Sequence, residues 1–314
     1  MSPKGIPALS RREFLAIGSG ATAGTLLAGC VRADGPSDPG RLITKAIPSS
    51  GERIPAIGLG TDAFRVEDRE EIRAEIQRMS ELGGSVIDTA AAYGDSEALI
   101  GDALESLGLR ARMFLATKLV AAGGYSGAVG ADSFERSLQR LRTQHLDLLQ
   151  VHNLNGVDTL LPLMQQWRKA KRIRYIGVTT SRVGQHAELI AVMRSYPLDF
   201  IQVDYSLGDR DAAEAVLPLA LERKLAVLVN LPFGRASLFA QAAGRKLPEW
   251  AAEIDVKSWA QYFLKYVISH PAVTCAIPGS TKVGHLEDNQ GAGRGRLPDA
   301  AMRRKMEEYW DHAS

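Results

Sequence analysis

The chain has little that would support metal, disulfide or nucleic-acid chemistry. Its 314 residues include only two cysteines, Cys30 and Cys275. Two isolated thiols give no disulfide framework and no cluster spaced for zinc or an iron–sulfur centre. The formal net charge is +2, from 38 basic and 36 acidic side chains, so the basic surplus typical of nucleic-acid-binding proteins is missing. We therefore expect chemistry without a protein-bound metal, and no nucleic-acid partner.

A complete glycine-rich dinucleotide turn is also lacking. The segment Ile57-Gly58-Leu59-Gly60-Thr61 has the first two glycines of a Gly-x-Gly-x-x-Gly turn, and no third one follows. An open doubly wound sheet of the Rossmann type would need that turn after its first strand. From residue 42 onward, short apolar runs alternate with amphipathic helical patterns almost to the end of the chain. The alternation predicts a (β/α)8 barrel rather than the open sheet.

The first thirty residues are typical of an export signal rather than of the fold. Arg11-Arg12 precedes an apolar run rich in Gly and Ala that ends at Gly29, and this order is typical of twin-arginine signals. The run is too short and too weakly apolar for a comfortable membrane span. Leu27-Ala28-Gly29-Cys30 resembles a bacterial lipobox, in which Cys30 becomes the lipidated N-terminus and the membrane anchor.

We divide the chain accordingly into a signal over residues 1–30, a flexible tether over 31–41 and a barrel domain over 42–314. The expected location is the periplasm or cell envelope, reached by the twin-arginine route. This route moves folded proteins, which suits an enzyme that captures its cofactor before export. Cleavage after Ala33 by a plain signal peptidase is one alternative, and a cytoplasmic protein with an unprocessed N-terminus is another. With Cys30 lipidated, Cys275 is a free core thiol.

Eight apolar runs are the expected barrel strands. They are 56–59, 85–88, 113–117, 146–151, 173–178, 200–203, 226–229 and 274–277. Helical patterns between them include 67–82, 133–141 and 212–222. Residues 42–46 and 51–54 flank a turn and predict a hairpin that closes the N-terminal face of the barrel. Two further segments, 235–256 and 297–310, interrupt the alternation as a lid and a buttress.

Polar residues at the ends of neighbouring strands are the candidate catalytic groups. Asp88 ends the second expected strand, Lys118 follows the third and His152 follows the fourth, while Tyr93 lies five residues after Asp88. Each could be an ordinary strand-end residue by itself. Because reactive side chains of (β/α)8 barrels come from the carboxyl ends of different strands, the four residues together predict a proton-transfer site.

The four side chains suggest a mechanism without a metal. A nearby ammonium lowers the pKa of a phenol, so Lys118 is expected to make Tyr93 a tuned proton donor. Asp88 would hold Lys118, and His152 would orient the substrate oxygen. A carbonyl oxygen that gains negative charge without a metal implies a hydride arriving at the carbon, and hence a nicotinamide cofactor.

The sequence resembles the aldo-keto reductases over nearly its whole mature length. The matching motifs, in order, are Gly58-Leu59-Gly60-Thr61, Asp88-Thr89-Ala90, Tyr93-Gly94, Ser96-Glu97, Ile100-Gly101, Thr117-Lys118, Val151-His152-Asn153 and Leu297-Pro298. The resemblance implies a (β/α)8 barrel that binds NADP(H) in extended form, with NAD(H) as the alternative. It also implies a catalytic tetrad of Asp88, Tyr93, Lys118 and His152.

The cofactor residues that the resemblance implies depart in part from the family's pattern. They are Gly60, Thr61, Asp88, Thr179, Thr180, Gln202, Asn230, Phe233, Gly234, Pro278, Ser280, Thr281, Lys282, His285, Asp288 and Asn289. Thr179-Thr180 replace the usual Ser-Asn pair. Asn230 stands where many members stack an aromatic ring on the nicotinamide, a contact we assign to Phe233. Lys282 is expected to provide the cation for the 2′-phosphate.

The resulting hypothesis is an exported NAD(P)H-dependent reductase that converts a small aldehyde or ketone to the alcohol. A non-catalytic NADP(H)-binding redox sensor or envelope-complex subunit is the alternative from another class, because an exported reductase meets little free NADPH. A barrel isomerase or lyase that uses the same Lys and His is a third hypothesis.

Overall fold

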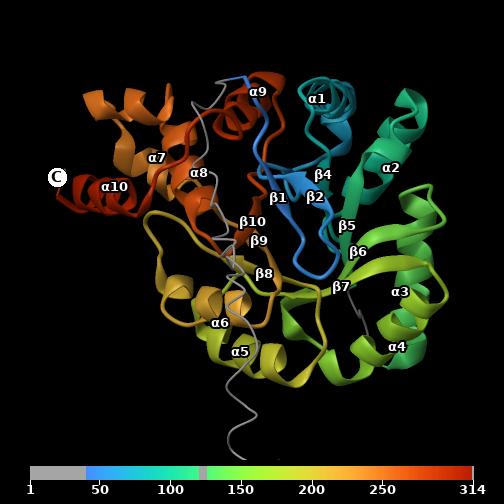
Figure 1. Cartoon of the computed structure of the whole chain (residues 1–314). Coiled ribbons are helices and arrows are strands. Elements are labelled where there is room, and N and C mark those ends of the chain that lie inside the picture. Colours follow the sequence, from blue (N-terminus) through green and yellow to red (C-terminus); the bar gives the residue numbers. More distant parts are fainter. Residues whose placement is uncertain (1–39, 120–125, 313–314) are drawn as a thin grey trace, which may run out of the picture. The chain divides into compact units, whose positions relative to one another are not determined.

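The structure, a computed structural model, describes residues 40–119 and 126–312 (Figure 1). Eight parallel strands lie side by side in chain order. They are β3 (Leu59–Gly60), β4 (Val86–Asp88), β5 (Phe114–Leu119), β6 (Leu146–Val151), β7 (Ile173–Thr179), β8 (Phe200–Asp204), β9 (Ala226–Asn230) and β10 (Val273–Ala276). The expected signal and tether, residues 1–39, lie outside the described residues, as do residues 120–125.

The sheet closes between its first and last strands. Parallel bridges join Ile57 to Ala276 and Gly60 to Gly279, and the Gly60 amide donates to the Pro278 carbonyl at 2.9 Å. The two backbones approach so closely that a Cβ on Gly60 would lie 2.7 Å from the Ile277 carbonyl oxygen. This closure makes the fold a (β/α)8 barrel, as the alternation of apolar runs predicts.

Helices follow the strands and cover the outside of the barrel (Figure 1). They are α1 (Arg69–Glu81), α2 (Ser96–Leu107), α3 (Gly127–Arg140), α4 (Val157–Lys169), α5 (His186–Ser195), α6 (Val216–Glu222), α7 (Ser237–Ala242), α8 (Trp259–Ser269), α9 (Val283–Ala292) and α10 (Ala300–His312). In α1 the buried side chains Ile72, Ile76 and Met79 recur at helical spacing, which sets the face that packs on the strands.

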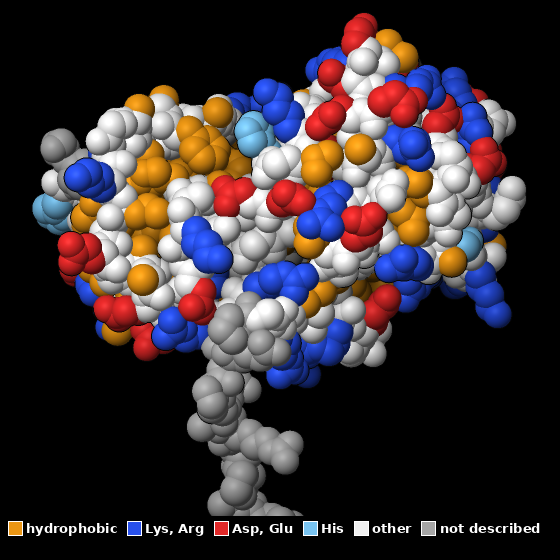
Figure 2. Space-filling model, turned by 90° about the horizontal axis from the view of Figure 1, so that it is seen from above, with side chains coloured by type: hydrophobic (Ala, Val, Ile, Leu, Met, Phe, Trp, Pro, Cys, Tyr) orange, Lys and Arg blue, Asp and Glu red, His pale blue; other side chains and the backbone are white. Residues whose placement is uncertain are grey.

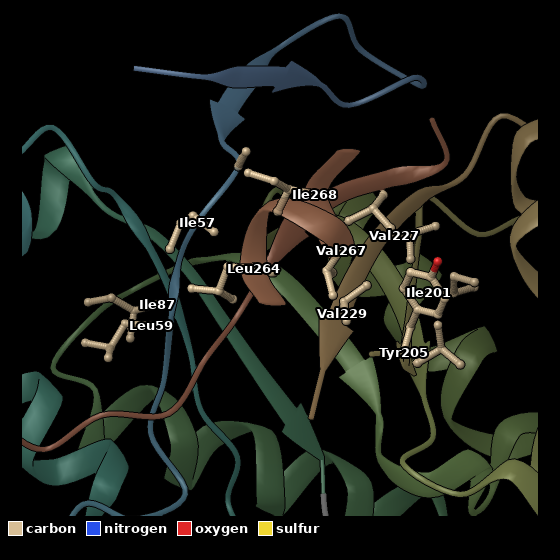
Figure 3. Close-up of a cluster of buried hydrophobic side chains, with 14 of the residues drawn as sticks. Ile57, Leu59, Ile87, Ile201, Tyr205, Val227, Val229, Leu264, Val267 and Ile268 are labelled. Atoms are coloured by element: carbon tan, nitrogen blue, oxygen red, sulfur yellow. The ribbon is translucent and has the colours of Figure 1, made fainter. Parts of the chain in front are cut away.

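Apolar side chains form one layer outside the barrel strands and one inside them. The outer layer lies between strands and helices, where Ile57, Val227 and Val229 belong to the same cluster as Leu264 and Val267 of α8 (Figure 3). The inner layer contains side chains from alternate positions of the strands and from the hairpin, namely Ile47, Ile54, Val86, Phe114, Ala116, Leu148, Tyr175, Phe200, Ala226, Leu228, Cys275 and Ile277. Cys275 is a buried free thiol, as expected.

The N-terminal hairpin forms as predicted, from β1 (Thr44–Ala46) and β2 (Arg53–Pro55) in antiparallel pairing. Ile47 and Ile54 are buried in the inner layer, so the hairpin caps the amino end of the barrel. Of the two predicted additions, the first contains α7 and a short 3-10 helix over Glu249–Ile254, and the second contains α10. Among the described residues, no helix is both long and apolar enough to span a membrane.

Candidate active site

A cleft of about 1010 Å³ lies at the carboxyl end of the strands. Its lining comes from the residues that follow β3, β4, β6, β7, β9 and β10, from Gln202 inside β8, and from the first turns of α8 and α9 up to Asn289. The side of the molecule formed by α7, α8 and α10 gathers many apolar side chains in the space-filling view, whereas acidic and basic side chains are mixed elsewhere (Figure 2). A volume near the upper end of the range for ligand pockets suits a large organic ligand.

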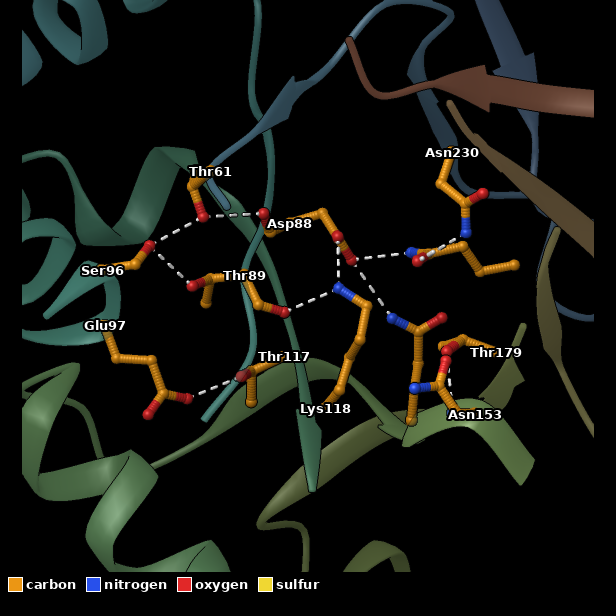
Figure 4. A network of polar contacts seen from close by, with 12 residues as sticks. Thr61, Asp88, Thr89, Ser96, Glu97, Thr117, Lys118, Asn153, Thr179 and Asn230 are labelled. Atoms are coloured by element: carbon orange, nitrogen blue, oxygen red, sulfur yellow. Dashed lines mark hydrogen bonds and ion pairs between the residues drawn. The ribbon is translucent and has the colours of Figure 1, made fainter. Parts of the chain in front are cut away.

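Asp88 and Lys118 form a buried ion pair at one end of the cleft. Asp88 is the last residue of β4, and Lys118 lies inside β5, which extends two residues beyond the predicted strand. The Lys118 ammonium donates to Asp88 Oδ2 at 2.5 Å and to the Thr89 carbonyl at 2.8 Å (Figure 4). Both side chains are at most 3% exposed, so water screens the pair very little.

Tyr93 and His152 lie beside this pair. The Lys118 Nζ is 4.9 Å from the centre of the Tyr93 ring, and the Tyr93 and His152 rings meet edge to face with centroids 6.0 Å apart. Asp88, Tyr93 and His152 all line the cleft. The structure therefore brings the four predicted catalytic residues together around one point.

The electrostatics of Tyr93 differ from the expectation. Burial raises the pKa of the Tyr93 phenol, and the opposing effect of the Lys118 ammonium, the next largest, does not overcome it. Lys118 lowers this pKa, as expected, but desolvation outweighs the charge, so the expectation of a lower pKa for Tyr93 is wrong in its net direction. Burial, helped by the Lys118 charge, lowers the pKa of His152 to about 4, so this imidazole is neutral at physiological pH. The Asp88 carboxylate offsets burial and raises the pKa of Lys118, which keeps it charged.

A second set of hydrogen bonds fixes the loop that carries Tyr93. The Thr61 hydroxyl donates to the Asp88 carbonyl at 3.0 Å, and Ser96 Oγ is 2.8 Å from Thr61 Oγ1 and 2.9 Å from Thr89 Oγ1. Behind them, buried Glu97 accepts from the Thr117 hydroxyl at 2.6 Å (Figure 4). Both ends of the Tyr93 loop are thus tied to β3 and β5.

Amide side chains continue the network from Asp88 across the barrel mouth. Gln150 and Gln202 donate to Asp88 Oδ1 at 3.2 and 2.9 Å, and Asn230 donates to Gln202 Oε1 at 3.3 Å and to the Thr180 carbonyl at 2.9 Å. Asn230 Oδ1 is buried and has no hydrogen-bond partner among the described residues. Asn230 lines the cleft, so a buried acceptor is left for a ligand.

The turn that carries His152 has a strained backbone. Asn153 and Leu154 have φ angles of 53° and 60°, in the left-handed region that non-glycine residues rarely adopt. The backbone N–H of Asn153 donates to Thr179 Oγ1 at 3.3 Å, and the backbone carbonyl of Asn153 accepts from Gln185 Nε2 at 3.2 Å. Gln185 Oε1 in turn accepts from the Thr180 hydroxyl at 2.8 Å. The Thr179 and Thr180 hydroxyls therefore hold the His152 turn.

We expect Thr180→Val to impair carbonyl reduction without weakening cofactor binding. The change removes the hydroxyl that donates to Gln185 and accepts from the Arg182 backbone amide, and with it one support of the strained turn. Losing the hydrogen bond to Gln185 costs roughly 1 kcal/mol, so kcat/KM should fall about fivefold. Steady-state kinetics and fluorescence titration with cofactor measure the two effects. Thr143→Val, at a buried threonine bonded to Arg110 and the His145 carbonyl, is the control. Weaker cofactor binding with normal kcat/KM would contradict this assignment.

Most of the predicted cofactor residues line the cleft. These are Gly60, Thr61, Asp88, Thr179, Gln202, Asn230, Phe233, Ser280, Thr281, His285, Asp288 and Asn289. Thr180, Gly234, Pro278 and Lys282 are not among the lining residues. Lys282 is exposed at the N-cap of α9. Its expected role as the phosphate-binding cation therefore lacks support from the shape of the cleft.

The sequence analysis did not identify several other residues at this site. Arg182 and Arg235 are exposed and line the cleft after β7 and β9, and Trp259 lines it at the start of α8. Gln150 does not line the cleft but bonds to Asp88 from near the end of β6, and its polar side chain in a fully buried strand is the signal that could have marked it. The positions of Arg182 and Arg235 in polar loops give no comparable signal.

Comparison with known proteins identifies the family. A sequence model described as "Aldo/keto reductase family" matches residues 56–308. The chain belongs to this family. It is 30% identical over 267 residues to methylglyoxal reductase YeaE of Escherichia coli (strain K12), covering 82% of this chain and 92% of that protein. It is 32% identical over 228 residues to aldo-keto reductase YhdN of Bacillus subtilis (strain 168), covering 67% of this chain and 66% of that protein.

Solved aldo-keto reductase structures have the same fold. A Klebsiella pneumoniae aldo-keto reductase in complex with NADPH superposes with a TM-score of 0.73 at 25% identity, covering 86% of this chain and 96% of that one. A second Klebsiella pneumoniae structure, in complex with NADP and acetate, gives a TM-score of 0.71 at 26% identity, covering 83% and 93% of the two chains. Family membership and these neighbours together establish an oxidoreductase of the aldo/keto reductase family.

Proposed function

We propose that this aldo/keto reductase converts an aldehyde or ketone to the alcohol with NADPH or NADH, and that Tyr93 is the general acid. The observation that carries the proposal is the arrangement of Tyr93 and His152 beside the buried Asp88–Lys118 pair, at the wall of a cleft of about 1010 Å³. The Klebsiella pneumoniae relatives solved with NADPH and NADP support the choice of cofactor.

The residues at this end of the cleft fit a nicotinamide ring with its carboxamide. Asn230 Oδ1 is a buried acceptor without a partner, which suits the amide N–H of a carboxamide. Phe233 supplies a half-buried aromatic ring in the same wall. Gln202 is already bonded through both amide atoms to Asp88 and Asn230, so we assign it to holding Asn230 rather than to direct contact. When bound, the reduced cofactor supplies a hydride to the carbonyl carbon.

The protein's own part in the reaction is proton transfer and positioning. Neutral His152 donates a hydrogen bond to the carbonyl oxygen and orients it toward Tyr93. The Tyr93 hydroxyl gives its proton to that oxygen as negative charge develops there. Lys118 stabilises the phenolate that remains, because its ammonium lies over the Tyr93 ring. Asp88 keeps Lys118 charged inside a site that would otherwise favour the neutral amine.

The pKa shifts predict how carbonyl reduction depends on pH. Tyr93, with a raised pKa, keeps its proton beyond its ordinary value near 10, and His152, with a pKa of about 4, is neutral above about pH 5. The kcat for reduction should therefore be flat from about pH 5.5 to pH 9. Alcohol oxidation, which needs the phenolate, should rise continuously over the same range. A fall in the kcat for carbonyl reduction with a midpoint near pH 6.5 would instead show that the His152 imidazole titrates within this pH range.

The direct test of the proposal is turnover by the full chain with NADPH or NADH and a panel of aldehydes and ketones. The panel includes methylglyoxal, because the Escherichia coli relative is a methylglyoxal reductase. We expect cofactor oxidation that depends on the carbonyl compound and matches alcohol formation mole for mole. Tight cofactor binding without turnover over the whole panel would instead support the non-catalytic binding protein.

We further propose that the protein is exported by the twin-arginine route and anchored through Cys30. Only the sequence supports this, through Arg11-Arg12 and the run that ends at Cys30. The test is cell fractionation of the wild type and of the Arg11→Lys/Arg12→Lys variant. We expect the wild type in the membrane fraction and the variant in the cytoplasm, and an identical cytoplasmic location for both would exclude export.

A further inference from the structure

The far end of the cleft is the place where the adenosine part of the cofactor would lie. Because the hydride must reach a carbonyl held by Tyr93, the nicotinamide belongs at the tetrad. The part of the cleft on the other side of β3 is lined by the segment before α9, by the start of α8 and by the first two turns of α9, with Ser280, Thr281, His285 and Asp288 among its residues. An inference about this end rests on the proposed use of a nicotinamide cofactor.

Two carboxyl groups from α1 reach this segment. Glu71 Oε1 accepts a hydrogen bond from the Val283 amide at 3.1 Å, so one of the free N–H groups at the start of α9 is already taken by an acid. Glu75 follows one helical turn later, is 0% exposed, and has no hydrogen-bond partner for either carboxyl oxygen among the described residues. The Ser280 hydroxyl is close enough to lower the pKa of Glu75, although it donates its own hydrogen bond to the Lys282 carbonyl at 3.1 Å.

The cations near this segment do not offset the two acids. Lys282 is exposed and does not line the cleft, and no ion pair joins it to either glutamate within the described part of the chain. Arg78 of α1 pairs with Glu81 and Glu287 on the exposed side. His285 is the imidazole that lines this end of the cleft. A ligand phosphate here would meet negative charge from α1 and little positive charge in return.

We infer that Glu71 and Glu75 set the cofactor preference, by weakening the binding of NADPH, with its 2′-phosphate, relative to NADH, with its 2′-hydroxyl. NADH and NADPH differ only in that phosphate, which carries about −1.5 to −2 charges at neutral pH. Both acids lie at the segment that meets this group, and Glu75 acts from behind Ser280, without touching the ligand. Glu71 is exposed to solvent, whereas Glu75 is fully buried and its charge is screened less, and the repulsion is expected to cost NADPH about tenfold in affinity.

Glu75 also makes the preference depend on pH. Burial, the largest effect, raises the pKa of Glu75 to about 7, Ser280 lowers it and the Glu71 charge raises it. The carboxyl is therefore mainly neutral near pH 6 and mainly ionised near pH 8. Glu71 is the charged group that acts on Glu75. Of the cations on the packed helices, Arg78 is paired as described above and Arg69 pairs with Asp102 of α2, while Lys282 and His285 lie at the start of α9. The ratio of the NADPH and NADH dissociation constants should thus rise across this pH interval.

The experiment measures dissociation constants of NADPH and NADH by fluorescence titration of the full chain near pH 6 and pH 8. The proteins are the wild type, Glu71→Gln, Glu75→Gln and the control Glu70→Gln, whose side chain is 83% exposed on the same helix. Glutamine keeps the size of the side chain and removes the charge. We expect both test variants to bind NADPH more tightly at pH 8, by about threefold to tenfold, with NADH binding unchanged and the control like the wild type.

The pH dependence separates charge from structure. The phosphate has its own ionisation near pH 6, which acts equally in every protein, so the informative quantity is the difference between the wild type and Glu75→Gln. That difference should be small near pH 6 and large near pH 8. Equal changes for NADH and NADPH, or a wild-type preference for NADPH that neither variant alters, would overturn the inference. Failure of both cofactors to bind any of the proteins would instead overturn the proposed function.

The pH dependence of the unfolding temperature shows whether the Glu75→Gln variant folds normally. The raised pKa means that the folded protein loses stability as the pH rises from about 4.5 to about 7, because the unfolded chain ionises Glu75 first. Glu75→Gln should therefore unfold at the same temperature as the wild type near pH 4.5 and at a higher temperature near pH 8. A lower unfolding temperature at both pH values would mean that the Gln amide disturbs the packing, and the inference would then be decided on Glu71→Gln.

Discussion

Replacing Tyr93 by Phe is expected to lower kcat for carbonyl reduction by about 10²- to 10⁴-fold while changing the cofactor dissociation constant by less than about twofold. The variant loses one hydroxyl, and that hydroxyl is the group proposed to donate the proton. The ring keeps its position beside His152 and over the Lys118 ammonium, so the shape of the cleft should persist. Single-turnover oxidation of bound cofactor after mixing with the carbonyl compound measures the chemical step directly.

Tyr196→Phe is the matched control for this substitution. Tyr196 is a phenol whose hydroxyl donates to Asp158 on the surface and does not line the cleft. Its loss should leave kcat within about twofold of the wild type. A Tyr93→Phe protein that binds cofactor normally and reduces the carbonyl at the wild-type rate would show that another group, such as His152, supplies the proton.

The second large effect is expected from Asp88→Asn, which should destabilise the fold by about 3 to 5 kcal/mol and lower activity as well. Asp88 neutralises Lys118 at a depth where neither side chain is more than 3% exposed. The Asn variant leaves the buried ammonium without its counter-charge and disturbs the hydrogen bonds from Gln150 and Gln202. Urea unfolding followed by circular dichroism gives the change in the free energy of unfolding.

The pH dependence of this loss identifies its cause. Without Asp88, burial lowers the pKa of Lys118 in the folded state below its unfolded value. The variant should therefore regain stability as the pH rises toward about 9 and Lys118 loses its proton, while the wild type, in which Lys118 has a raised pKa, should not. Asp132→Asn, which breaks an exposed pair with Arg136, should cost less than about 0.5 kcal/mol at any pH. If Asp88→Asn lowered the free energy of unfolding by as little as this control does, the result would contradict a buried ion pair between Asp88 and Lys118.

The fold could be predicted from the sequence because its periodic pattern is strong. Each of the eight expected strands overlaps a strand of the barrel, and β6 has the predicted bounds. The errors are systematic at the carboxyl ends. β5, β7, β8 and β9 continue through polar residues that a hydrophobic pattern excludes, namely Lys118, Thr179, Asp204 and Asn230. In this barrel the polar mouth is part of the hydrogen-bonded ladder, so polarity does not mark the end of a strand.

The tetrad could be predicted as a group, but its electrostatics could not. The carboxyl ends of successive parallel strands must meet, so Asp88, Lys118 and His152 could be expected at one place. The direction of the Tyr93 pKa depends on how completely the phenol is buried, and that depends on loops whose conformation sequence patterns do not determine. The roles of Glu71 and Glu75 depend in the same way on how α1 packs against α9, a contact between segments about 200 residues apart.

The measurement that tests the central claim most directly is the fate of the hydride. The wild-type protein is supplied with NADH or NADPH that carries deuterium at the transferable position, together with a carbonyl compound that it consumes. The account predicts that mass spectrometry finds one deuterium in the alcohol product, on the former carbonyl carbon, for each cofactor oxidised. Alcohol or isomerised product without deuterium, or cofactor that stays reduced while the substrate is consumed, would contradict it.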